Sequence, residues 1–269
     1  MRIALTVILV LTTFSSLQAD LTDVRITEVW TGLSGGRPDG SHDWIEITNL
    51  GDTSIETSEL LYDDEDPDPD NFNQLQSLTL EPGESAIFLL DVIGDNPMFD
   101  TAIGEFLSVW TAVDPFLVAN AGEASKLGAN GDAANLLTAD GVLFDSFQYS
   151  AGNADTFMTI ERTGPGFTDV RRSVFGENGA IESEMYFDED TNQIAVDENG
   201  APIILIGSPG VFMMDVLGDV NCDCAVNLLD VGPFVDAISS GVFDPKADIN
   251  GDGSVDLLDV GEFVALLSG

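Results

Sequence analysis

The amino-terminal two-thirds of the chain alternates apolar and polar residues with the period of two that is typical of β-strands. In "DVRITEVW" the alternation places Val24, Ile26 and Trp30 on one face of a strand. In "DWIEITNL" it places the two isoleucines on one face and Trp44 and Glu46 on the other. Both segments are therefore predicted to be strands with one apolar face.

Turn signals separate these and further apolar runs at short intervals. They lie at Pro82-Gly83, Asp140-Gly141 and Asn199-Gly200. No long helical periodicity occurs before residue 210, and the segment 94–123 is interpreted as an insertion. Many short strands with frequent turns are typical of an all-β sandwich. The sequence therefore predicts a mainly β domain over residues 20–212.

After residue 212 the pattern changes, and the chain repeats itself with a period of 29 residues. Residues 219–239 and 248–268 are identical at 12 of 21 aligned positions, which indicates an internal duplication. An apolar stripe at helical spacing occurs in each half: Leu228, Val231, Phe234, Val235 and Ile238, then Leu257, Val260, Phe263, Val264 and Leu267. The stripes predict two short helices that pack on each other, and Gly241 is the expected end of the first one. We expect a linker over 213–217 and a small all-α module over 218–269.

Each half of the duplication begins with a loop rich in side-chain oxygens, over 219–230 and 248–259. In the second loop these oxygens fall at positions one, three, five, nine and twelve, with glycine at position six. This is the spacing of an EF-hand calcium loop, in which alternate side chains converge on one ion and the glycine permits a sharp turn. The residues before each loop do not predict the entering helix of a full EF-hand.

A loop followed by one helix, present twice in residues 218–269, resembles the type I dockerin family of calcium-binding modules in exported proteins. The resemblance implies two Ca²⁺ ions and a cohesin-like or other protein receptor. It implies ligation by Asp219, Asn221, Asp223, Ala225, Asn227 and Asp230 in the first loop, and by Asp248, Asn250, Asp252, Ser254, Asp256 and Asp259 in the second. Ala225 and Ser254, at position seven, would ligate through their backbone carbonyls.

The chain departs from the dockerin pattern at two places. Leu228-Leu229 and Leu257-Leu258 occupy loop positions ten and eleven, where many dockerins carry hydroxyl residues. We expect one leucine of each pair in the core and the other exposed, which favours an apolar receptor surface. Cys222 and Cys224 occupy positions four and six of the first loop. Two hypotheses stay open there: a strained disulfide that pins the turn, or two free thiols beside a weaker site.

The first 19 residues have the features of a secretory signal peptide. They contain Arg2, an apolar run over 3–11, and Ala19 at a plausible cleavage site. We therefore expect a secreted, extracellular or cell-surface protein, with no membrane span in the mature chain. The 48 acidic and 8 basic residues give a net charge of −40, which disfavours nucleic acid as a partner.

The β domain resembles the lamin-tail domain (LTD), an immunoglobulin-like sandwich. The matching segments, in chain order, are "RITEV", "DWIEITNLGDTSI", "LEPGE", "LLTADGVLFDSFQY", "TIERTG" and "GSPG". The resemblance implies a binding or structural module that has no shared catalytic residues. It leaves the ligand of the sandwich unidentified.

Together these features predict a secreted, non-catalytic binding or structural protein that is docked through a calcium-dependent tail. The alternative is an extracellular hydrolase or accessory subunit in polysaccharide catabolism, because dockerins often accompany carbohydrate-active domains. His42 is the single histidine, so the chain offers one imidazole and a catalytic triad is disfavoured. A cleft with two facing carboxylates about 5–10 Å apart would favour the hydrolase.

Overall fold

The structure is a computed structural model, and it describes residues 21–32, 43–64, 72–90, 98–121, 126–153, 157–163, 169–185, 187–188, 193–197, 199–212, 217–221, 226–241, 243–244 and 246–268. The predicted signal peptide, His42, Cys222 and Cys224 lie outside these residues. The described part of the chain is mainly β, as the sequence predicts. Its three α-helices are all too short to cross a membrane.

The main sheet has six strands in the order β12-β11-β1-β2-β7-β8. In chain order these strands are β1 (Val24–Trp30), β2 (Trp44–Asn49), β7 (Ser85–Leu89), β8 (Val118–Asn120), β11 (Ile160–Thr163) and β12 (Asp169–Arg172). Neighbouring strands are antiparallel except β7 and β8, which are parallel. The two strands first expected from alternation, β1 and β2, therefore lie side by side at the centre.

A β-bulge at Thr27 reverses which side of the sheet the side chains at the end of β1 face. The register pairs Ile26 with Ile47 and then Glu28 with Glu46, so Thr27 is the additional residue. Val24, Ile26 and Val29 consequently pack in one core, while Trp30 packs in another on the opposite face. The prediction that Trp30 shares a face with Val24 and Ile26 is wrong for this reason.

A second sheet of four strands packs on the main sheet. Its order is β10-β9-β4-β5, built from β4 (Leu60–Asp64), β5 (Asn73–Gln74), β9 (Gly131–Thr138) and β10 (Leu143–Ser150). Residues of both sheets, including Ile45, Phe88, Tyr62, Leu136 and Phe147, form the largest buried cluster. The predicted hairpin at Asp140-Gly141 is confirmed, because β9 and β10 pair directly across it.

Short two-stranded pairs complete the β part of the chain. They are formed by β3 (Ile55–Glu56) with β6 (Thr79–Leu80), β13 (Ile181–Glu182) with β16 (Ile206–Gly207), and β14 (Phe187–Asp188) with β15 (Gln193–Ile194). Gly83 has φ of 82°, so a turn does occur at Pro82-Gly83. The strands that flank this turn, β6 and β7, pair with different partners.

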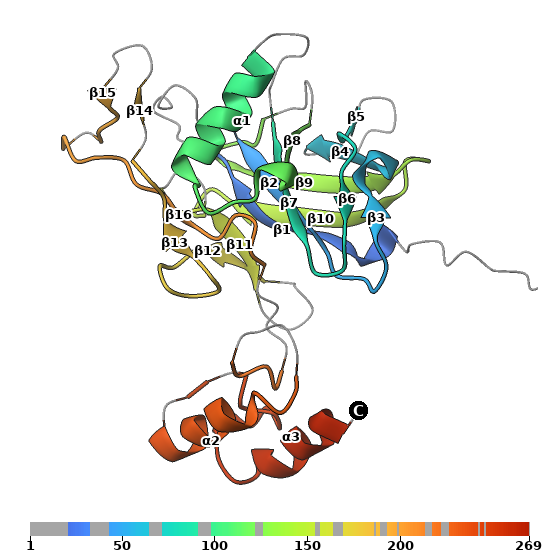
Figure 1. Ribbon diagram of the computed structural model, residues 1–269, viewed down its shortest axis with the longest axis vertical. Coiled ribbons are helices and arrows are strands. Elements are labelled where there is room, and N and C mark those ends of the chain that lie inside the picture. The colour runs from blue at the N-terminus through green and yellow to red at the C-terminus, as the bar shows by residue number, and fades with distance from the viewer. Residues whose placement is uncertain are drawn as a thin grey trace, which may run out of the picture.

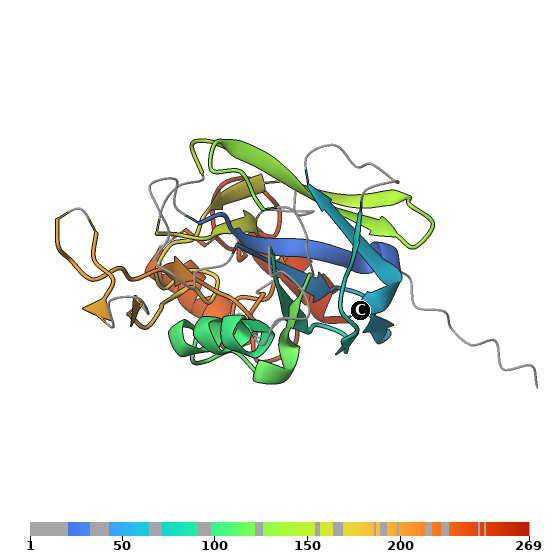
Figure 2. The ribbon, with the colours of Figure 1, turned by 90° about the horizontal axis from the view of Figure 1, so that it is seen from above.

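Helix α1 (Met98–Val109) covers the other face of the main sheet, as the three layers in Figure 2 show. Ala102, Phe106 and Val109 recur on one side of the helix and pack against Trp30 and Trp44. The Phe106 ring meets the Trp44 ring edge-on at 5.9 Å between centroids. The described residues of segment 94–123, interpreted from the sequence as an insertion, supply this helix and strand β8, and both contribute to the core.

The carboxyl-terminal part contains α2 (Val231–Ser240) and α3 (Asp259–Ser268), which lie together apart from the sheets in Figure 1. The rings of Phe234 and Phe263 stack at 4.0 Å between centroids and anchor a separate small core. Helix α2 ends at Gly241, whose φ of 65° supports the predicted helix stop. No helix precedes either loop within the described residues 199–212, 217–221, 243–244 and 246–250.

Candidate metal centre

The second predicted calcium loop, residues 248–259, curls around its own carboxylates. Asp259, at loop position twelve, accepts hydrogen bonds from the backbone N–H groups of Asn250 at 3.0 Å and Asp256 at 2.9 Å. Asp248, at position one, accepts from the N–H groups of Asp252 at 3.1 Å and Gly253 at 2.8 Å. The first and last positions of the loop therefore both turn inward, although they are far apart in the loop sequence.

The first loop repeats this arrangement where it is described. Asp230 accepts from the N–H groups of Asn221 at 3.0 Å and Asn227 at 2.8 Å, which correspond to the two bonds of Asp259. Asn227 in turn accepts from Leu229 at 2.8 Å, as Asp256 accepts from Leu258 at 2.7 Å. The duplication seen in the sequence is therefore also a duplication of hydrogen bonds.

Four loop carboxylates are buried: Asp219, Asp230, Asp248 and Asp259. Burying an ionised carboxylate is unfavourable unless a positive charge or several hydrogen bonds compensate it. None of the ion pairs between described residues involves Asp230, Asp248 or Asp259. Oxygen-only donor sets of this kind fit a hard cation such as calcium.

The described side chains do not, as they lie, bring three carboxylate, histidine or thiol groups within reach of one ion. Calcium ligation by Asp219, Asn221, Asn227, Asp230, Asp248, Asn250, Asp252, Ser254, Asp256 and Asp259 therefore stays a prediction. Asp223 and Ala225, the remaining predicted ligands, lie outside the described residues. If bound, the ion would add positive charge beside Asp230, Asp248 and Asp259, for which the ion pairs between described residues supply none.

The turn of the second loop depends on two glycines. Gly251 and Gly253, at positions four and six, have φ of 70° and 86°, which a residue with a Cβ rarely adopts. A Cβ added at either glycine would meet no heavy atom within 4 Å, so the constraint is conformational rather than steric. Cys222 and Cys224 occupy these positions in the first loop, outside the described residues.

Both leucines of each pair are exposed, contrary to the expectation that one of each would join the core. Leu228 and Leu257 are 79% and 78% exposed, and Leu229 and Leu258 are both 68% exposed. The reason is that each helix begins later than the apolar stripe suggested, so the leucines lie in the turn before it. The matching exposures show that the two copies present the same surface.

The apolar stripes are also less buried than the prediction of helix-on-helix packing implied. Phe234 and Phe263 are buried, but Val235 and Val264 are more than half exposed. An apolar groove of about 240 Å³ runs between α2 and α3, and Leu257 lies at its margin. The module therefore buries one pair of aromatic rings and leaves much of its apolar surface accessible.

A second cluster of carboxylates lies inside the main sheet, where the sequence did not predict a site. Glu28 pairs in register with Glu161 on one side and with Glu46 on the other, so the three glutamates form one row across β11, β1 and β2. Residues directly opposite each other on neighbouring strands point to the same face. All three glutamates are almost fully buried.

Hydroxyl, amide and guanidinium groups surround this row. Glu28 accepts hydrogen bonds from the hydroxyl of Thr159 and from the backbone N–H and hydroxyl of Ser208, at 2.9 and 3.1 Å for the latter two. Glu46 accepts from the Thr27 hydroxyl and from the N–H of Gly210, both at 2.6 Å. Glu161 accepts from Arg171 at 2.8 Å.

Burial raises the pKa of all three glutamates. The pKa of Glu46 rises to about 8, chiefly because burial disfavours its charged form and secondly because Glu28 repels it. The pKa of Glu161 rises to about 7 for the same two reasons, against the opposing effect of Arg171. The pKa of Glu28 is raised by burial despite its four hydrogen bonds. These groups therefore retain protons at pH values where ordinary glutamates are ionised.

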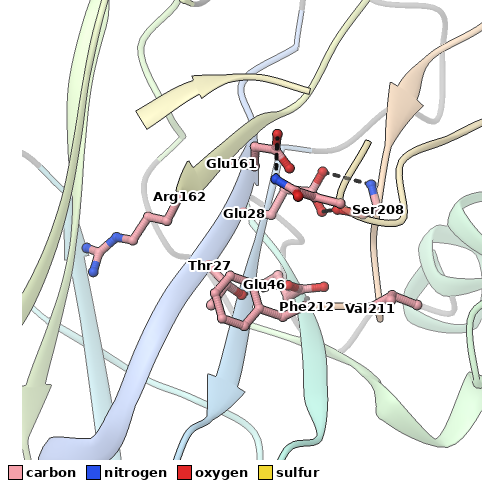
Figure 3. A pocket seen from close by; sticks show the side chains of 9 residues that line it. Thr27, Glu28, Glu46, Glu161, Arg162, Ser208, Val211 and Phe212 are labelled. Atoms are coloured by element: carbon pink, nitrogen blue, oxygen red, sulfur yellow. Dashed lines mark hydrogen bonds between the residues drawn. The ribbon is translucent and has the colours of Figure 1, made fainter. Parts of the chain in front are cut away.

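The cavity that these glutamates line is small. Figure 3 shows Glu28, Glu46 and Glu161 around it, with Arg162 pointing away from them. Its volume is about 10 Å³, roughly the space of one water molecule and far less than a sugar ring requires. This row of carboxylates is therefore not the open pair that glycoside hydrolysis needs.

Four segments that are distant in the sequence meet in this network: "RITEV" supplies Thr27 and Glu28, "DWIEI" supplies Glu46, "TIERTG" supplies Thr159 and Glu161, and "GSPG" supplies Ser208 and Gly210. Alternation alone suggested that Glu46 points away from the core.

No protein-family model matches the chain. No curated protein matches it either. Among solved structures, it is similar to a DUF4876 family protein from Bacteroides thetaiotaomicron VPI-5482, with 11% sequence identity and a TM-score of 0.33. The similarity covers 76% of this chain and 74% of the other.

Proposed function

We propose that this chain is a secreted, non-catalytic binding or structural protein, docked to a protein receptor through a calcium-folded tail. The β part is proposed to be an immunoglobulin-like sandwich of the lamin-tail type, and residues 218–269 a dockerin-like module. The observation that carries the proposal is the repeated loop geometry. In both copies the carboxylate at position twelve accepts the N–H groups of positions three and nine.

Calcium is proposed to fold the tail because the loops bury carboxylates and the helices are short. Helices α2 and α3 have 10 residues each, fewer than an isolated helix needs to be stable in water. The stacked rings of Phe234 and Phe263 join the two helices in a small apolar core. An ion bound by each loop would fix the start of the following helix and hold the two rings together.

The exposed leucine pairs are proposed to be the receptor-binding residues. Four leucines with 68–79% exposure form an apolar surface that a freely dissolved module has no structural need for. Their repetition gives the module two contact points of matching exposure, and Leu257 also lines the groove between the helices. The sequence position matches the receptor-contacting position of dockerins, although the chemistry is apolar instead of hydroxyl.

The test is capture of exported proteins of the parent organism by the full mature chain, with calcium and with EDTA. A chain carrying Leu228→Ser and Leu257→Ser should lose the captured receptor, which mass spectrometry identifies. Phe116→Ser is the matched control, since Phe116 is 84% exposed but lies in the β part. Capture that is equal with EDTA, or equal for the double variant, would contradict the proposal.

A further inference from the structure

The three buried glutamates of the main sheet form an unusual electrostatic arrangement. Like charges directly opposite each other on neighbouring strands destabilise a sheet, and here three such residues stand in one row. The strands fix their spacing, so the side chains cannot move apart as surface residues do. The arrangement is compatible with folding only if the row carries less than its full charge or if cations compensate it.

Cations compensate the row only in part. Arg171 on β12 bonds to Glu161, but it also bonds to Glu177 at 2.9 Å. Arg162 follows Glu161 on β11, yet its guanidinium lies on the opposite face and pairs with Asp145 at 2.8 Å. Among the described residues, the ionisable groups that line the cavity are Glu28, Glu46, Glu161 and Arg162, and beyond it Arg171 pairs with Glu161 and with Glu177. One arginine, which also pairs outside the row, therefore compensates one of the three carboxylates.

One segment covers the row and is held by it. Residues 207–212 leave strand β16 and lead toward the helical module, and two of their backbone N–H groups, those of Ser208 and Gly210, bond to Glu28 and Glu46. The contact is close: a Cβ on Gly207 would lie 2.6 Å from Thr159 Cγ2 and 3.0 Å from Glu28 Oε1. Val211 and Phe212 complete the cover of the cavity.

We propose that Glu28, Glu46 and Glu161 form a proton-dependent clamp, which holds the segment 207–212 on the sheet and releases it when the row loses its protons. In the sequence, the released segment precedes the predicted linker 213–217 and the helical module. The clamp would therefore convert a rise in pH into freedom of the chain that enters this linker. This inference is independent of calcium binding and of receptor docking.

The covering segment is the part that opens, because it is bound to the sheet less strongly than the strands are bound to each other. Strands β11, β1 and β2 are joined to each other by backbone ladders. Beyond Gly207 the segment has no ladder, and the carboxylates themselves accept its N–H groups. Opening it lets water reach the carboxylates without unpairing the sheet. This local unfolding therefore requires less free energy than separation of the strands.

The protonation equilibria are consistent with this geometry. The pKa of Glu46 is about 8 and that of Glu161 about 7, with burial as the main cause and Glu28 as the second in both cases. The closed clamp therefore binds protons that an open, hydrated clamp would release. Opening is favoured as pH rises through this range, since proton release then accompanies it.

Amide hydrogen exchange of the full mature chain, measured by nuclear magnetic resonance between pH 5 and 9 with calcium present, tests the clamp. Rates are divided by the intrinsic rate at each pH, and the amides of Ser208 and Gly210 are compared with that of Phe88 on β7. We expect protection of Ser208 and Gly210 to fall by at least about tenfold per pH unit between about pH 5 and pH 8, because at least one proton leaves Glu46 or Glu161 on each opening in this interval. The contribution of these two groups levels off above pH 8, and Phe88 stays protected throughout.

The variant Glu46→Gln keeps the size of the side chain and removes its titration. At pH 9 it should protect Gly210 at least about tenfold better than the wild type does, because the wild type gains opening from the ionisation of Glu46 and the variant does not. Glu182→Gln is the matched control, because Glu182 is exposed on β13 beside the same segment. It should leave the pH dependence unchanged.

Two results would overturn the clamp. One is protection of Ser208 and Gly210 that changes with pH no more than that of Phe88. The other is a Glu46→Gln chain with the wild-type pH dependence. If that variant does not fold, carboxyl ¹³C shifts of the wild-type glutamates decide the question. Their titration midpoints must coincide with the loss of protection, and midpoints in the ordinary glutamate range would exclude the proposal.

Discussion

Both parts of this molecule bury carboxylates, but their surroundings differ. In the sheets, three glutamates occupy fixed positions on neighbouring strands and accept hydroxyl, amide and guanidinium groups. In the tail, aspartates occupy curling loops, where Asp230, Asp248 and Asp259 accept backbone N–H groups of the same loop. A strand holds its side chains in a row, whereas a loop can gather them around one point.

This difference explains why the same residue class suits different chemistry in each part. Carboxylates in a rigid row cannot converge on an ion, so protonation is their way of losing charge. Carboxylates in a loop with glycine turns can converge, and calcium is then the ligand that fits them. We therefore expect the β part to respond to pH and the tail to respond to calcium.

Calcium removal should produce the largest difference between the two parts. With EDTA we expect the helices of the tail to unfold, because a ligand at a thousandfold excess over its Kd contributes about 4 kcal/mol to stability. The three tryptophans, Trp30, Trp44 and Trp110, are all buried in the β part, so their fluorescence reports on the sheets alone. Circular dichroism should lose helical signal while tryptophan emission stays unchanged.

The same titration with magnesium in place of calcium is the control for general charge screening. Protease cleavage after EDTA should fall within residues 213–269 and spare the sheets. Equal helical signal and equal cleavage with calcium and with EDTA would show that the tail folds without the ion.

A rise in pH should produce the second largest effect, and it should act on the sheets. Above pH 4.5 an unfolded Glu46 releases its proton, while the folded one retains it up to about pH 8. The unfolded state therefore binds fewer protons in this interval, and the free energy of unfolding falls as pH rises. Since one pKa unit corresponds to about 1.4 kcal/mol, a loss on the order of 3 kcal/mol between pH 5 and 9 is expected.

Urea unfolding followed by tryptophan fluorescence measures this loss for the β part. The Glu46→Gln chain should show a smaller loss over the same interval, because one of the titrating groups is gone. A β part that gains stability from pH 5 to 9 would contradict the raised pKa values and the account of the row.

Local patterns predicted the features that depend on short stretches of chain. The loop spacing and the β9–β10 hairpin at Asp140-Gly141 rest on residues within one loop or one turn, and the duplication is read from the sequence directly. The helix stop at Gly241 has the same local origin, because only glycine readily adopts the left-handed conformation found there. Whether the loops hold calcium is a separate prediction that the fold does not test.

Features that depend on distant segments were missed or wrong. The bulge at Thr27 moved Trp30 to the other face, since the register with β2 and not the local alternation decides where the strand end points. Glu46 looked solvent-facing because nothing near it in sequence shows that residues 207–212 cover it. The exposure of Leu229 and Leu258 depends on where each helix begins, which an apolar stripe does not fix.

The Thr27 hydroxyl allows a finer comparison of buried and exposed carboxylates. It lies 2.6 Å from Glu46 Oε1 and 2.8 Å from Thr48 Oγ1 inside the sheet. Thr27→Val keeps the shape and removes these bonds, which should cost about 1–2 kcal/mol because a buried acceptor is left without its donor. Thr79→Val is the matched control, since the Thr79 hydroxyl bonds to the exposed Glu56.

Urea unfolding of the two threonine variants gives the comparison directly. Solvent replaces the lost donor at Glu56, so Thr79→Val should change stability by less than about 0.5 kcal/mol. Equal costs for the two substitutions would mean that burial does not set the strength of the interaction at Glu46.

The smallest stability effect is expected where the tail is most apolar on its surface. Leu228→Ser and Leu257→Ser should each change the free energy of unfolding of the tail by less than about 0.5 kcal/mol, because both side chains are nearly 80% exposed. Phe263→Ala, by contrast, removes a buried ring from the small core and should cost about 3 kcal/mol or more. Calcium-dependent thermal unfolding followed by circular dichroism separates the two. A leucine variant as unstable as Phe263→Ala would mean that these leucines pack within the tail, and receptor binding would then lose its proposed contact residues.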